Sequence, residues 1–372
     1  MSEQRFASSV YTARLARAAE LAGEAGQDAV FVAPGPDLQY LTGSRASTFE
    51  RLTVLVVPAS GAPVLVVPRM ELAAMRESAV GELPAVEVRD WVDGQDPYAL
   101  ALDGLGEVAR YGVSEAMPAL HSVPLAAAVG AAPELATPVL RRLRMIKDEA
   151  EIAALRRAGA AIDRVHARVG EWLRPGRTER EIAADIAAAI VEEGHSEADF
   201  VIVGSGPNGA DPHHEVSDRV VQDGETVVVD IGGPVEPGYN SDSTRTYAVG
   251  RAPEEVATAF AALERAQQAA VDAVRPGVTA ESVDAAARRV LDDAGLADRF
   301  IHRTGHGIGL SVHEEPYIVA GETTVLEPGM AFSIEPGIYF PGEWGARIED
   351  IVVVTDDGVE PLNTRPHGLV SL

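Results

Sequence analysis

The chain has 372 residues, more than twice the length of a typical domain, so the length predicts two domains, each able to bury a full core. It contains no cysteine, which excludes disulfides, thiolate zinc sites, iron–sulfur clusters and a cysteine nucleophile. Its net charge of −26 comes from 57 acidic and 31 basic residues, and the arginines are scattered along the chain, so a nucleic-acid partner is excluded. Any metal ion must therefore be held by oxygen atoms and imidazole nitrogens.

The N-terminal sequence MSEQRFASSVYTARLARAAE lacks the apolar segment of a signal peptide. No later apolar run approaches the length that crosses a bilayer. We therefore expect a soluble, cytoplasmic protein that does not bind a membrane.

The first part of the chain alternates helical and strand-like segments. Residues 10–25 have helical spacing, whereas DAVFVA, TVLVVP and APVLVVP are typical of buried strands. This alternation predicts a small α/β domain with a mixed sheet over residues 1–143. A long amphipathic helix is expected over residues 141–173, with the boundary near Leu143 and a second domain over residues 144–372.

The second part contains an internal repeat. RPGRTEREIAADIAAAIVEEG starts at Arg174 and RPGVTAESVDAAARRVLDDAG starts at Arg275, and each opens a helix. In the first copy Thr178 and Glu181 predict a capping box. After each copy the same features follow in the same order: a histidine, an acid at the end of an apolar run, and a second acid after a short loop. The pairs are His213 and His313, Asp230 and Glu335, and Asp242 and Glu349. We expect two related α/β halves that face each other.

An acid inside an apolar run is costly, because a buried carboxylate needs a charged partner or a metal ion. Asp230 alone is compatible with a strand-end or turn residue. Strand alternation, however, places Asp242 with Thr244 on one face, and Arg347, Glu349 and Ile351 on another. Four carboxylates aimed at one cleft would repel one another, so the pattern predicts a cation, and two divalent ions fit the ligand set.

Histidines cluster in RFIHRTGHGIGLSVHEEP. His306 lies between glycines that let the backbone come close, and beside four acids it is better explained as a metal ligand than as a core histidine. His213 and His313 occupy matching positions in the two halves, which suggests a pair that flanks the substrate. We expect His214 to be exposed and His302 to pack or hydrogen-bond behind the glycine loop.

These residues resemble the dinuclear metal site of the pita-bread peptidases, the family of methionine aminopeptidase, aminopeptidase P and prolidase. HRTGHGIGL, SIEPGIY and RIEDIVVV match the motifs of that family, and the resemblance covers the whole second domain. GPDLQYLTGSRAS is similar to the N-terminal domain of the prolidase and aminopeptidase P branch, which methionine aminopeptidases lack. One departure is a loop between Asp230 and Asp242 that is one residue longer than usual.

The resemblance implies a fold and a role for each residue. The fold would be a small creatinase-type N-terminal domain followed by a pseudo-twofold pita-bread catalytic domain. Asp242 and Glu349 would bridge two metal ions, Asp230 would complete one ion, and His306 with Glu335 would complete the other. Glu335 would also act as general acid and base, as this chemistry requires. His213 and His313 would bind the peptide and the oxyanion, and Arg347 would orient a ligand carboxylate, that of Asp230.

The resemblance further implies an Xaa-Pro dipeptidase that acts on small peptides with proline at the second position, as a homodimer. The alternative is aminopeptidase P, which cleaves longer peptides. Carboxylate-rich ligands favour manganese, with cobalt, zinc or iron as alternatives. The carboxylate of a dipeptide could be bound by Arg303 or by an arginine of a partner's N-terminal domain, and a surface role for Arg303 is the alternative. A metal-free creatinase-type enzyme and a non-catalytic binding module both predict loss of the acidic ligands, and all five ligands are present.

Overall fold

The long helix expected across the domain boundary is interrupted at residues 145–148. The computed structural model, which describes residues 5–47 and 50–372, has helix α6 (Thr137–Arg144) and helix α7 (Glu149–Trp172) in its place. Asp148 caps α7 by accepting a hydrogen bond from the backbone N–H of Glu151, and the Glu151 side chain accepts one in return. Ile146 forms a β-bridge with Met330, which commits this segment to an extended conformation. The prediction of one continuous helix was therefore wrong.

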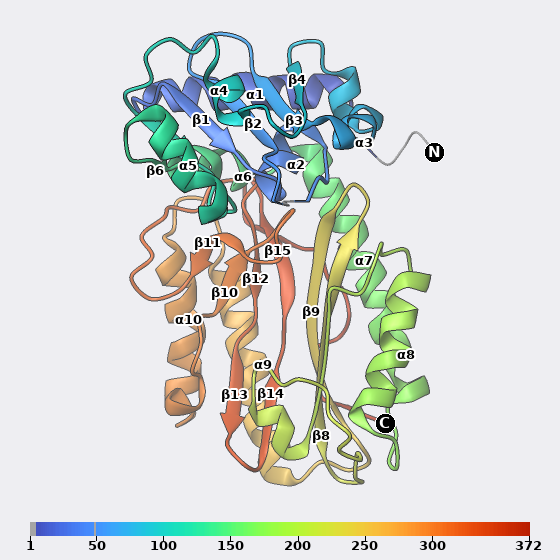
Figure 1. Cartoon of the computed structure of the whole chain (residues 1–372). Coiled ribbons are helices and arrows are strands. Elements are labelled where there is room, and N and C mark those ends of the chain that lie inside the picture. Colours follow the sequence, from blue (N-terminus) through green and yellow to red (C-terminus); the bar gives the residue numbers. More distant parts are fainter. Residues whose placement is uncertain (1–4, 48–49) are drawn as a thin grey trace. The chain divides into compact units, whose positions relative to one another are not determined.

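The chain divides at this break into two compact units, Met1–Arg144 and Met145–Leu372. The first unit is built on a six-stranded sheet in the order β4-β3-β2-β1-β5-β6 (Figure 1). Its strands are β1 (Ala29–Val32), β2 (Val54–Pro58), β3 (Val64–Pro68), β4 (Glu87–Trp91), β5 (Tyr111–Val113) and β6 (Glu134–Leu135). Its helices, besides α6, are α1 (Ser8–Glu24), α2 (Pro36–Thr42), α3 (Leu72–Glu77), α4 (Pro97–Leu102) and α5 (Ala119–Val129). Parallel and antiparallel pairs both occur, so the predicted mixed sheet is confirmed.

The second unit contains two larger sheets and a hairpin. The four-stranded sheet has the order β17-β9-β8-β7 and the five-stranded sheet has the order β11-β10-β12-β15-β16. The first sheet comprises β7 (Phe200–Ser205), β8 (Thr226–Val235), β9 (Tyr239–Ala248) and β17 (Val370–Ser371). The second comprises β10 (Gly305–Gly307), β11 (Glu314–Ile318), β12 (Ala331–Ile334), β15 (Asp350–Val354) and β16 (Val359–Pro361). The hairpin consists of β13 (Gly337–Phe340) and β14 (Trp344–Arg347).

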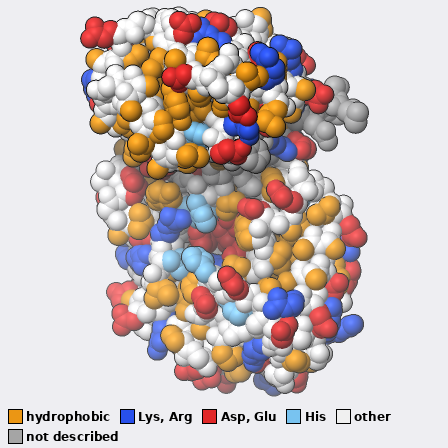
Figure 2. Space-filling view, viewed as in Figure 1, with side chains coloured by type: hydrophobic (Ala, Val, Ile, Leu, Met, Phe, Trp, Pro, Cys, Tyr) orange, Lys and Arg blue, Asp and Glu red, His pale blue; other side chains and the backbone are white. Residues whose placement is uncertain are grey.

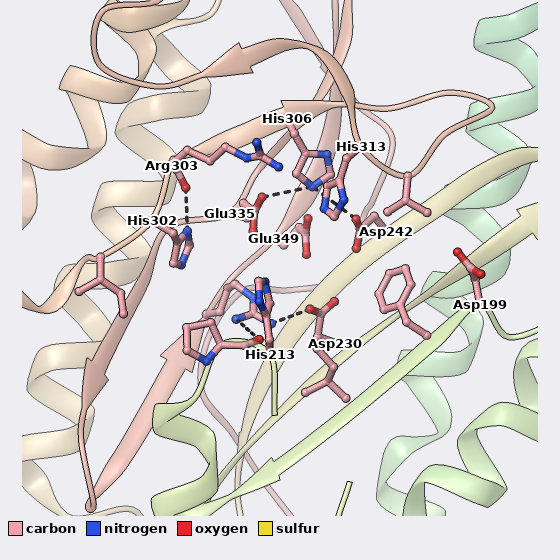
Figure 3. Close-up of a pocket in the computed structure, with 16 residues that line it drawn as sticks. Asp199, His213, Asp230, Asp242, His302, Arg303, His306, His313, Glu335 and Glu349 are labelled. Atoms are coloured by element: carbon pink, nitrogen blue, oxygen red, sulfur yellow. Dashed lines mark hydrogen bonds and ion pairs between the residues drawn. The ribbon is translucent and has the colours of Figure 1, made fainter. Parts of the chain in front are cut away.

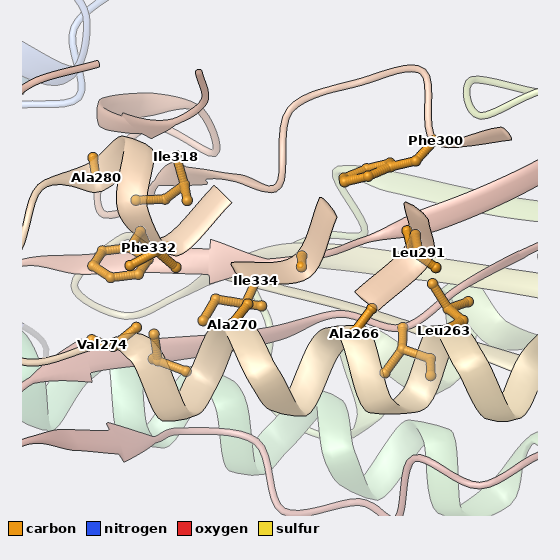
Figure 4. Packing of buried hydrophobic residues seen from close by; sticks show 14 of the residues in the cluster. Leu263, Ala266, Ala270, Val274, Ala280, Leu291, Phe300, Ile318, Phe332 and Ile334 are labelled. Carbon is orange, nitrogen blue, oxygen red and sulfur yellow. The ribbon is translucent and has the colours of Figure 1, made fainter. Parts of the chain in front are cut away.

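Two helix pairs repeat within this unit, as the duplicated sequence predicts. They are α7 with α8 (Glu179–Glu192), and α9 (Glu254–Ala273) with α10 (Ala280–Asp293). In Figure 1, α8 and α10 lie on opposite sides of the strands. Each pair covers a sheet with an apolar stripe: Leu263, Ala266 and Ala270 of α9 share a buried cluster with Phe332 and Ile334 of β12 (Figure 4).

The two halves differ at their helix starts. Thr178 accepts a hydrogen bond from the N–H of Glu181 and the Glu181 carboxylate accepts one from Thr178, so the predicted capping box is confirmed. Thr279 occupies the same position before α10, but its side chain makes no capping hydrogen bond within the described part of the chain. Over residues 5–47 and 50–372, no helix is long and apolar enough to span a membrane.

Two details of the strands differ from the sequence prediction. Asp230 does not end its strand, because β8 continues to Val235 and pairs with β9 along its whole length. Arg347 and Glu349 do not lie on one strand with Ile351 either. Arg347 ends β14, whereas β15 starts at Asp350. The break arises because β14 pairs with β13 while β15 pairs with β12, so the backbone changes partner at Ile348 and Glu349.

Candidate metal centre and active site

A cavity of about 710 Å³ lies within the second unit (Figure 3). Figure 2 shows histidine and acidic side chains gathered in a hollow on the visible face of this unit. All the site residues expected from the sequence line the cavity: His213, Asp230, Asp242, His306, His313, Glu335, Arg347 and Glu349. Arg303 and His302 line it as well, together with apolar side chains such as Phe200, Ile301 and Val312.

Asp230 and Asp242 come from adjacent antiparallel strands. Asp230 pairs with Thr244, and Asp242 pairs with Gly232, so the two acids are two residues apart along the ladder. Because side chains alternate along a strand, both carboxylates project from the same face of the sheet. An added Cβ at Gly232, opposite Asp242, would lie 2.4 Å from the Phe200 ring and from the Ser241 carbonyl oxygen, so this position has no room for a side chain.

His306 reaches the same place from β10. An added Cβ at Gly305 would lie 1.8 Å from the carbonyl oxygen of Ser333, and one at Gly307 would lie 2.3 Å from that of Glu315. Only glycine therefore allows this strand to lie so close to its neighbours. The backbone N–H of His306 donates to the Ser333 hydroxyl at 3.0 Å, which fixes the residue that carries the imidazole.

Three side chains offer oxygen and nitrogen atoms within 4.8 Å of one another: Asp242, His306 and Glu349. The Nε2 atom of His306 lies 3.6 Å from Oδ2 of Asp242 and 3.2 Å from Oε1 of Glu335. Its Nδ1 atom lies 3.1 Å from the carbonyl oxygen of Gly307, which accepts a hydrogen bond and leaves Nε2 as the lone-pair atom. Burial, and then the neighbouring His313, lower the pKa of His306 to about 3, so the ring is in the neutral form that binds metals.

The carboxylates lie close together, and two of their buried oxygens lack a hydrogen-bond partner in the described part of the chain. Burial, and then the charge of Asp230, raise the pKa of Asp242, and burial, followed by Asp242, raises the pKa of Glu349. Burial, reinforced by Asp230 and opposed by Arg347, raises the pKa of Glu335 to about 7. Asp230 Oδ1 and Glu349 Oε1 are buried without a hydrogen-bond partner among residues 5–47 and 50–372. Such oxygens are expensive unless a cation coordinates them, so this ligand set fits divalent metal ions.

Arg347 is the cation that the structure supplies. Its Nη2 donates to Asp230 Oδ2 at 2.5 Å, its Nε to Thr244 Oγ1 at 3.1 Å, and its Nη1 to the Tyr339 hydroxyl at 2.9 Å. The Thr244 hydroxyl in turn donates to Glu349 Oε2 at 2.8 Å. The guanidinium thus orients one acid directly and a second acid through a threonine, while one oxygen of each remains unpaired.

The two expected substrate histidines lie on different sides of the acids. Figure 3 shows His213 beside Asp230, whereas His313 lies beside His306 and Asp242. The rings of His306 and His313 meet edge to face, with 4.2 Å between their centres. His213 and His313 are both exposed, in contrast to the buried His306. Their position permits contact with a molecule in the cavity.

The structure tests two expectations about other histidines, and the one about His214 was wrong. His214 is only partly exposed, because its Nε2 lies 2.7 Å from a buried carboxylate oxygen of Glu179. His302 hydrogen-bonds as expected, to the Arg303 carbonyl at 2.7 Å and the Tyr339 hydroxyl at 2.9 Å, but it also lines the cavity. We did not predict from the sequence that Tyr339 belongs to the site, where its hydroxyl contacts His302 and Arg347. The signal was the spacing of two residues from Glu335 to Gly337 and on to Tyr339, which is typical of side chains on one face of a strand.

Comparison with known proteins identifies the chain. The model of metallopeptidase family M24 matches residues 153–356, more than half of the chain. The chain belongs to metallopeptidase family M24. The model of the Creatinase/Prolidase N-terminal domain matches residues 14–146. The chain is therefore a peptidase whose family works with bound metal, and the acidic cavity lies within the matched catalytic part.

Relatives in the M24 family match this chain over nearly its full length. The crystal structure of dipeptidase PepE from Mycobacterium ulcerans is 64% identical, covers 99% of each chain and superposes with a TM-score of 0.95. Prolidase from Thermococcus sibiricus is 38% identical, with 97% of this chain and 99% of that chain covered and a TM-score of 0.90. An Xaa-Pro dipeptidase of Lactobacillus delbrueckii subsp. lactis is 35% identical, over 91% of this chain and 93% of the relative. The prolidase and pita-bread resemblance seen in the sequence is confirmed.

Proposed function

We propose that this M24 peptidase is an Xaa-Pro dipeptidase, which hydrolyses the bond before proline in dipeptides. The observation that carries the proposal is the cavity in which four carboxylates and His306 converge and leave buried oxygens without a partner. Full-length similarity to proteins named dipeptidase, prolidase and Xaa-Pro dipeptidase supports the choice of substrate. The dipeptidase is favoured over aminopeptidase P on this basis.

The metal ligands that we propose are Asp230, Asp242, His306, Glu335 and Glu349. Of these, Asp242, His306 and Glu349 offer ligand atoms within 4.8 Å of one another, so they would hold an ion together. The ions that best suit oxygen-rich ligands without thiolate are manganese ions. When bound, two divalent ions polarise the scissile carbonyl and lower the pKa of an attacking water. The remaining steps are assigned to the side chains of this chain.

Glu335 is the proposed general base and acid. Its Oε1 accepts a hydrogen bond from the Ser333 hydroxyl at 3.2 Å and lies 3.2 Å from His306 Nε2, so the carboxylate is held in place. The side chain is 15% exposed, which lets water in the cavity reach it. A carboxylate in this position can take a proton from water and pass it to the leaving proline nitrogen.

His213 and His313 are the proposed hydrogen-bond donors to the substrate. They approach the acids from two sides, so one ring can bind the peptide while the other binds the oxygen that becomes negative in the transition state (Figure 3). Donors that are already positioned cost little reorganisation when this charge develops. Arg347 would hold Asp230 in the orientation that the reaction needs.

Arg303 is the proposed receptor for the carboxylate of the dipeptide. It lines the cavity, and its guanidinium lies over the ring of Tyr317, 4.5 Å from the ring centre. Stacking on a ring occupies the face of a guanidinium and leaves its N–H edge directed outward, where it can bind a carboxylate. Phe200, Ile301 and Val312 add apolar surface that suits a proline ring.

The test compares Ala-Pro, Ala-Pro-amide and Ala-Pro-Ala-Ala with manganese-loaded protein. Charge-assisted hydrogen bonds contribute about 1.5–3 kcal/mol, so kcat/KM for Ala-Pro should exceed that for the amide by about 10-fold or more. In Arg303→Met this preference should disappear, while Arg299→Met, which changes an arginine outside the cavity lining, should keep it. Faster cleavage of the tetrapeptide than of Ala-Pro would make the protein an aminopeptidase P.

A cytoplasmic location and a homodimeric assembly are further proposals. Both follow from the sequence and its family resemblance. Sedimentation of the purified protein tests the assembly, and fractionation of cells tests the location.

A further inference from the structure

Both proposed substrate histidines are exposed, yet each must stay in place to donate to a transition state. His213 lies in the long connection between β7 and β8, and His313 directly precedes β11. Neither histidine therefore lies within a helix or strand whose backbone hydrogen bonds would fix its position. The residue that follows each histidine, His214 or Glu314, makes a contact with a buried charged group.

Glu179 is the buried group in the first half. Its side chain is 0% exposed and accepts hydrogen bonds from the last residue of β7 and from three residues of the connection that carries His213. The donors are Ser205 (N–H at 2.8 Å, hydroxyl at 2.7 Å), Asn208 (amide at 3.0 Å), His214 (Nε2 at 2.7 Å) and Ser217 (N–H at 3.1 Å, hydroxyl at 2.6 Å). Burial alone opposes ionisation, but hydrogen bonds from Ser217, Ser205 and His214 lower the pKa of Glu179 to about 2. The group is therefore a carboxylate that ties the end of β7 and the first part of the connection, up to Ser217, to α8.

Lys147 is the buried group that contacts Glu314, the residue after His313. It is the only lysine in the sequence. Its side chain is 1% exposed, and its Nζ donates to Oε1 of Glu314 at 2.6 Å. The backbone N–H of Lys147 donates to the carbonyl oxygen of Gly329, so the lysine itself is fixed. A buried ammonium is costly without its partner, which makes this contact specific and hard to replace.

The two contacts share one feature: each holds the residue that follows a histidine, and His214 and Glu314 are 100 residues apart, as His213 and His313 are. Their buried partners, Glu179 and Lys147, carry opposite charges and both lie in the first half of the unit. We propose that Glu179 and Lys147 are positioning residues, which hold His213 and His313 in place through the next residue, His214 or Glu314. The inference rests on the proposed function, in which both histidines contact the substrate. It goes further by assigning a role to two residues that lie outside the cavity lining.

The chemistry of each contact predicts how it fails. In Glu179→Gln, one oxygen becomes an NH₂ group that faces donors, and the backbone N–H groups of Ser205 and Ser217 cannot reverse their direction as hydroxyls can. In Lys147→Met, the Glu314 carboxylate loses the buried ammonium group that holds it, so the segment that carries His313 is less restrained. In either variant the adjacent histidine moves, while the proposed metal ligands on β8, β9 and β10 are left in place.

The experiment combines hydrogen exchange with kinetics on the manganese-loaded protein. In Glu179→Gln the amides of residues 205–217 should exchange at least about 10-fold faster, and those of residues 312–318 should not change. In Lys147→Met the opposite pattern should hold. For Ala-Pro, kcat should fall by about 10- to 100-fold in each variant and by a larger factor than KM rises, because the transition state needs the displaced donor more than the bound peptide does.

A double-mutant cycle separates positioning from general loss of structure. Glu179→Gln should cost little further activity in a His213→Ala background but its full effect in His313→Ala, and Lys147→Met should show the reverse. Asp163→Asn is the matched control, because Asp163 is also buried and accepts hydrogen bonds from Asn363 and Thr364 far along the chain. Asp163→Asn should lower thermal stability, and its effect on activity should be the same in the His213→Ala and His313→Ala backgrounds.

The outcomes are distinct. Equal losses of activity in both histidine backgrounds, or unchanged kcat with faster exchange, would overturn the positioning role. If Glu179→Gln does not fold, the milder His214→Ala takes its place, and it must cost little further activity in the His213→Ala background. If Lys147→Met does not fold, Glu314→Gln takes its place, and it must cost little further activity in the His313→Ala background. If the unmodified protein hydrolyses no Xaa-Pro peptide, the proposed function fails, and unchanged exchange in both loops would then refute the anchoring as well.

Discussion

Glu335 is the proposed ligand that also serves as general base and acid. Its Oε1 lies 3.2 Å from His306 Nε2, and its side chain is 15% exposed, so water in the cavity can reach it. Asp230, in contrast, is held by the guanidinium of Arg347. A carboxylate that must accept and return a proton needs this accessible position.

Glu335→Gln should therefore abolish most turnover while the protein still folds. The change keeps the side-chain volume but removes a charge that serves as ligand and base, so kcat for Ala-Pro should fall at least ~10²-fold. The matched control is Glu327→Gln, an exposed glutamate before β12 that should retain full activity. Circular dichroism checks the fold, and near-normal turnover in Glu335→Gln would disprove the assigned role.

His213→Ala and His313→Ala should keep both metal ions and lose transition-state stabilisation. Removal of one donor to a developing negative charge costs on the order of 2–4 kcal/mol, about 30- to 1000-fold in kcat. Elemental analysis of the purified variants measures metal content, with His306→Ala as the variant that should lose metal. A loss of metal from either exposed histidine variant would show that this histidine is a ligand.

At the scale of the element, the two halves offer a natural comparison of helix caps. Thr178 and Glu181 form a complete capping box before α8, whereas Thr279 before α10 makes no side-chain cap in the described chain. The duplication therefore preserved the residue type at both helix starts but the hydrogen bonds at only one.

Thr178→Ala should lower the free energy of unfolding by about 1 kcal/mol, the usual cost of losing an N-cap threonine. Thr279→Ala should cost clearly less, because no capping hydrogen bond is removed. Urea unfolding of the two variants and the parent protein measures both values. Equal losses at the two positions would mean that Thr279 caps α10 in solution.

At the scale of the whole molecule, the ligand carboxylates couple stability to metal and pH. Burial raises the pKa of Glu335 to about 7, from 4.5, and also raises the pKa values of Asp242 and Glu349. Without metal, the native state then binds protons that the unfolded chain has released, so stability falls as pH rises through these folded pKa values. Burial lowers the pKa of His166 to about 3, so this residue makes stability rise with pH, but only below about pH 6.5, the pKa of an ordinary histidine.

The metal-free protein should therefore have a lower Tm at pH 8.5 than at pH 6.5, a range in which the buried histidines no longer contribute. Manganese should raise Tm at pH 8.5 by more than at pH 6.5, because the ions neutralise the same carboxylates. Calorimetry after removal of metal with a chelator, with and without added manganese, measures both effects. A metal-free protein that is equally stable at both pH values would contradict the crowding of charges in the cavity.

The sequence by itself determined the local chemistry of the M24 peptidase. Short continuous apolar runs predicted the buried strands at β1, β2 and β3, and the spacing of Thr178 and Glu181 predicted the capping box. The duplicated order of a histidine and two acids predicted which side chains collect in one cavity. These features depend on neighbours in the chain or on a repeated pattern, and both are visible without a fold.

Only the tertiary structure decided how distant segments share the cavity. The break after Arg144 depends on the bridge of Ile146 to Met330, and the split between β14 and β15 depends on which strand each one pairs with. The roles of Tyr339 and Glu179 likewise depend on partners that are remote in the sequence. A hydrogen bond between residues far apart in the sequence produces no periodic sequence pattern, because packing and not sequence spacing sets its geometry.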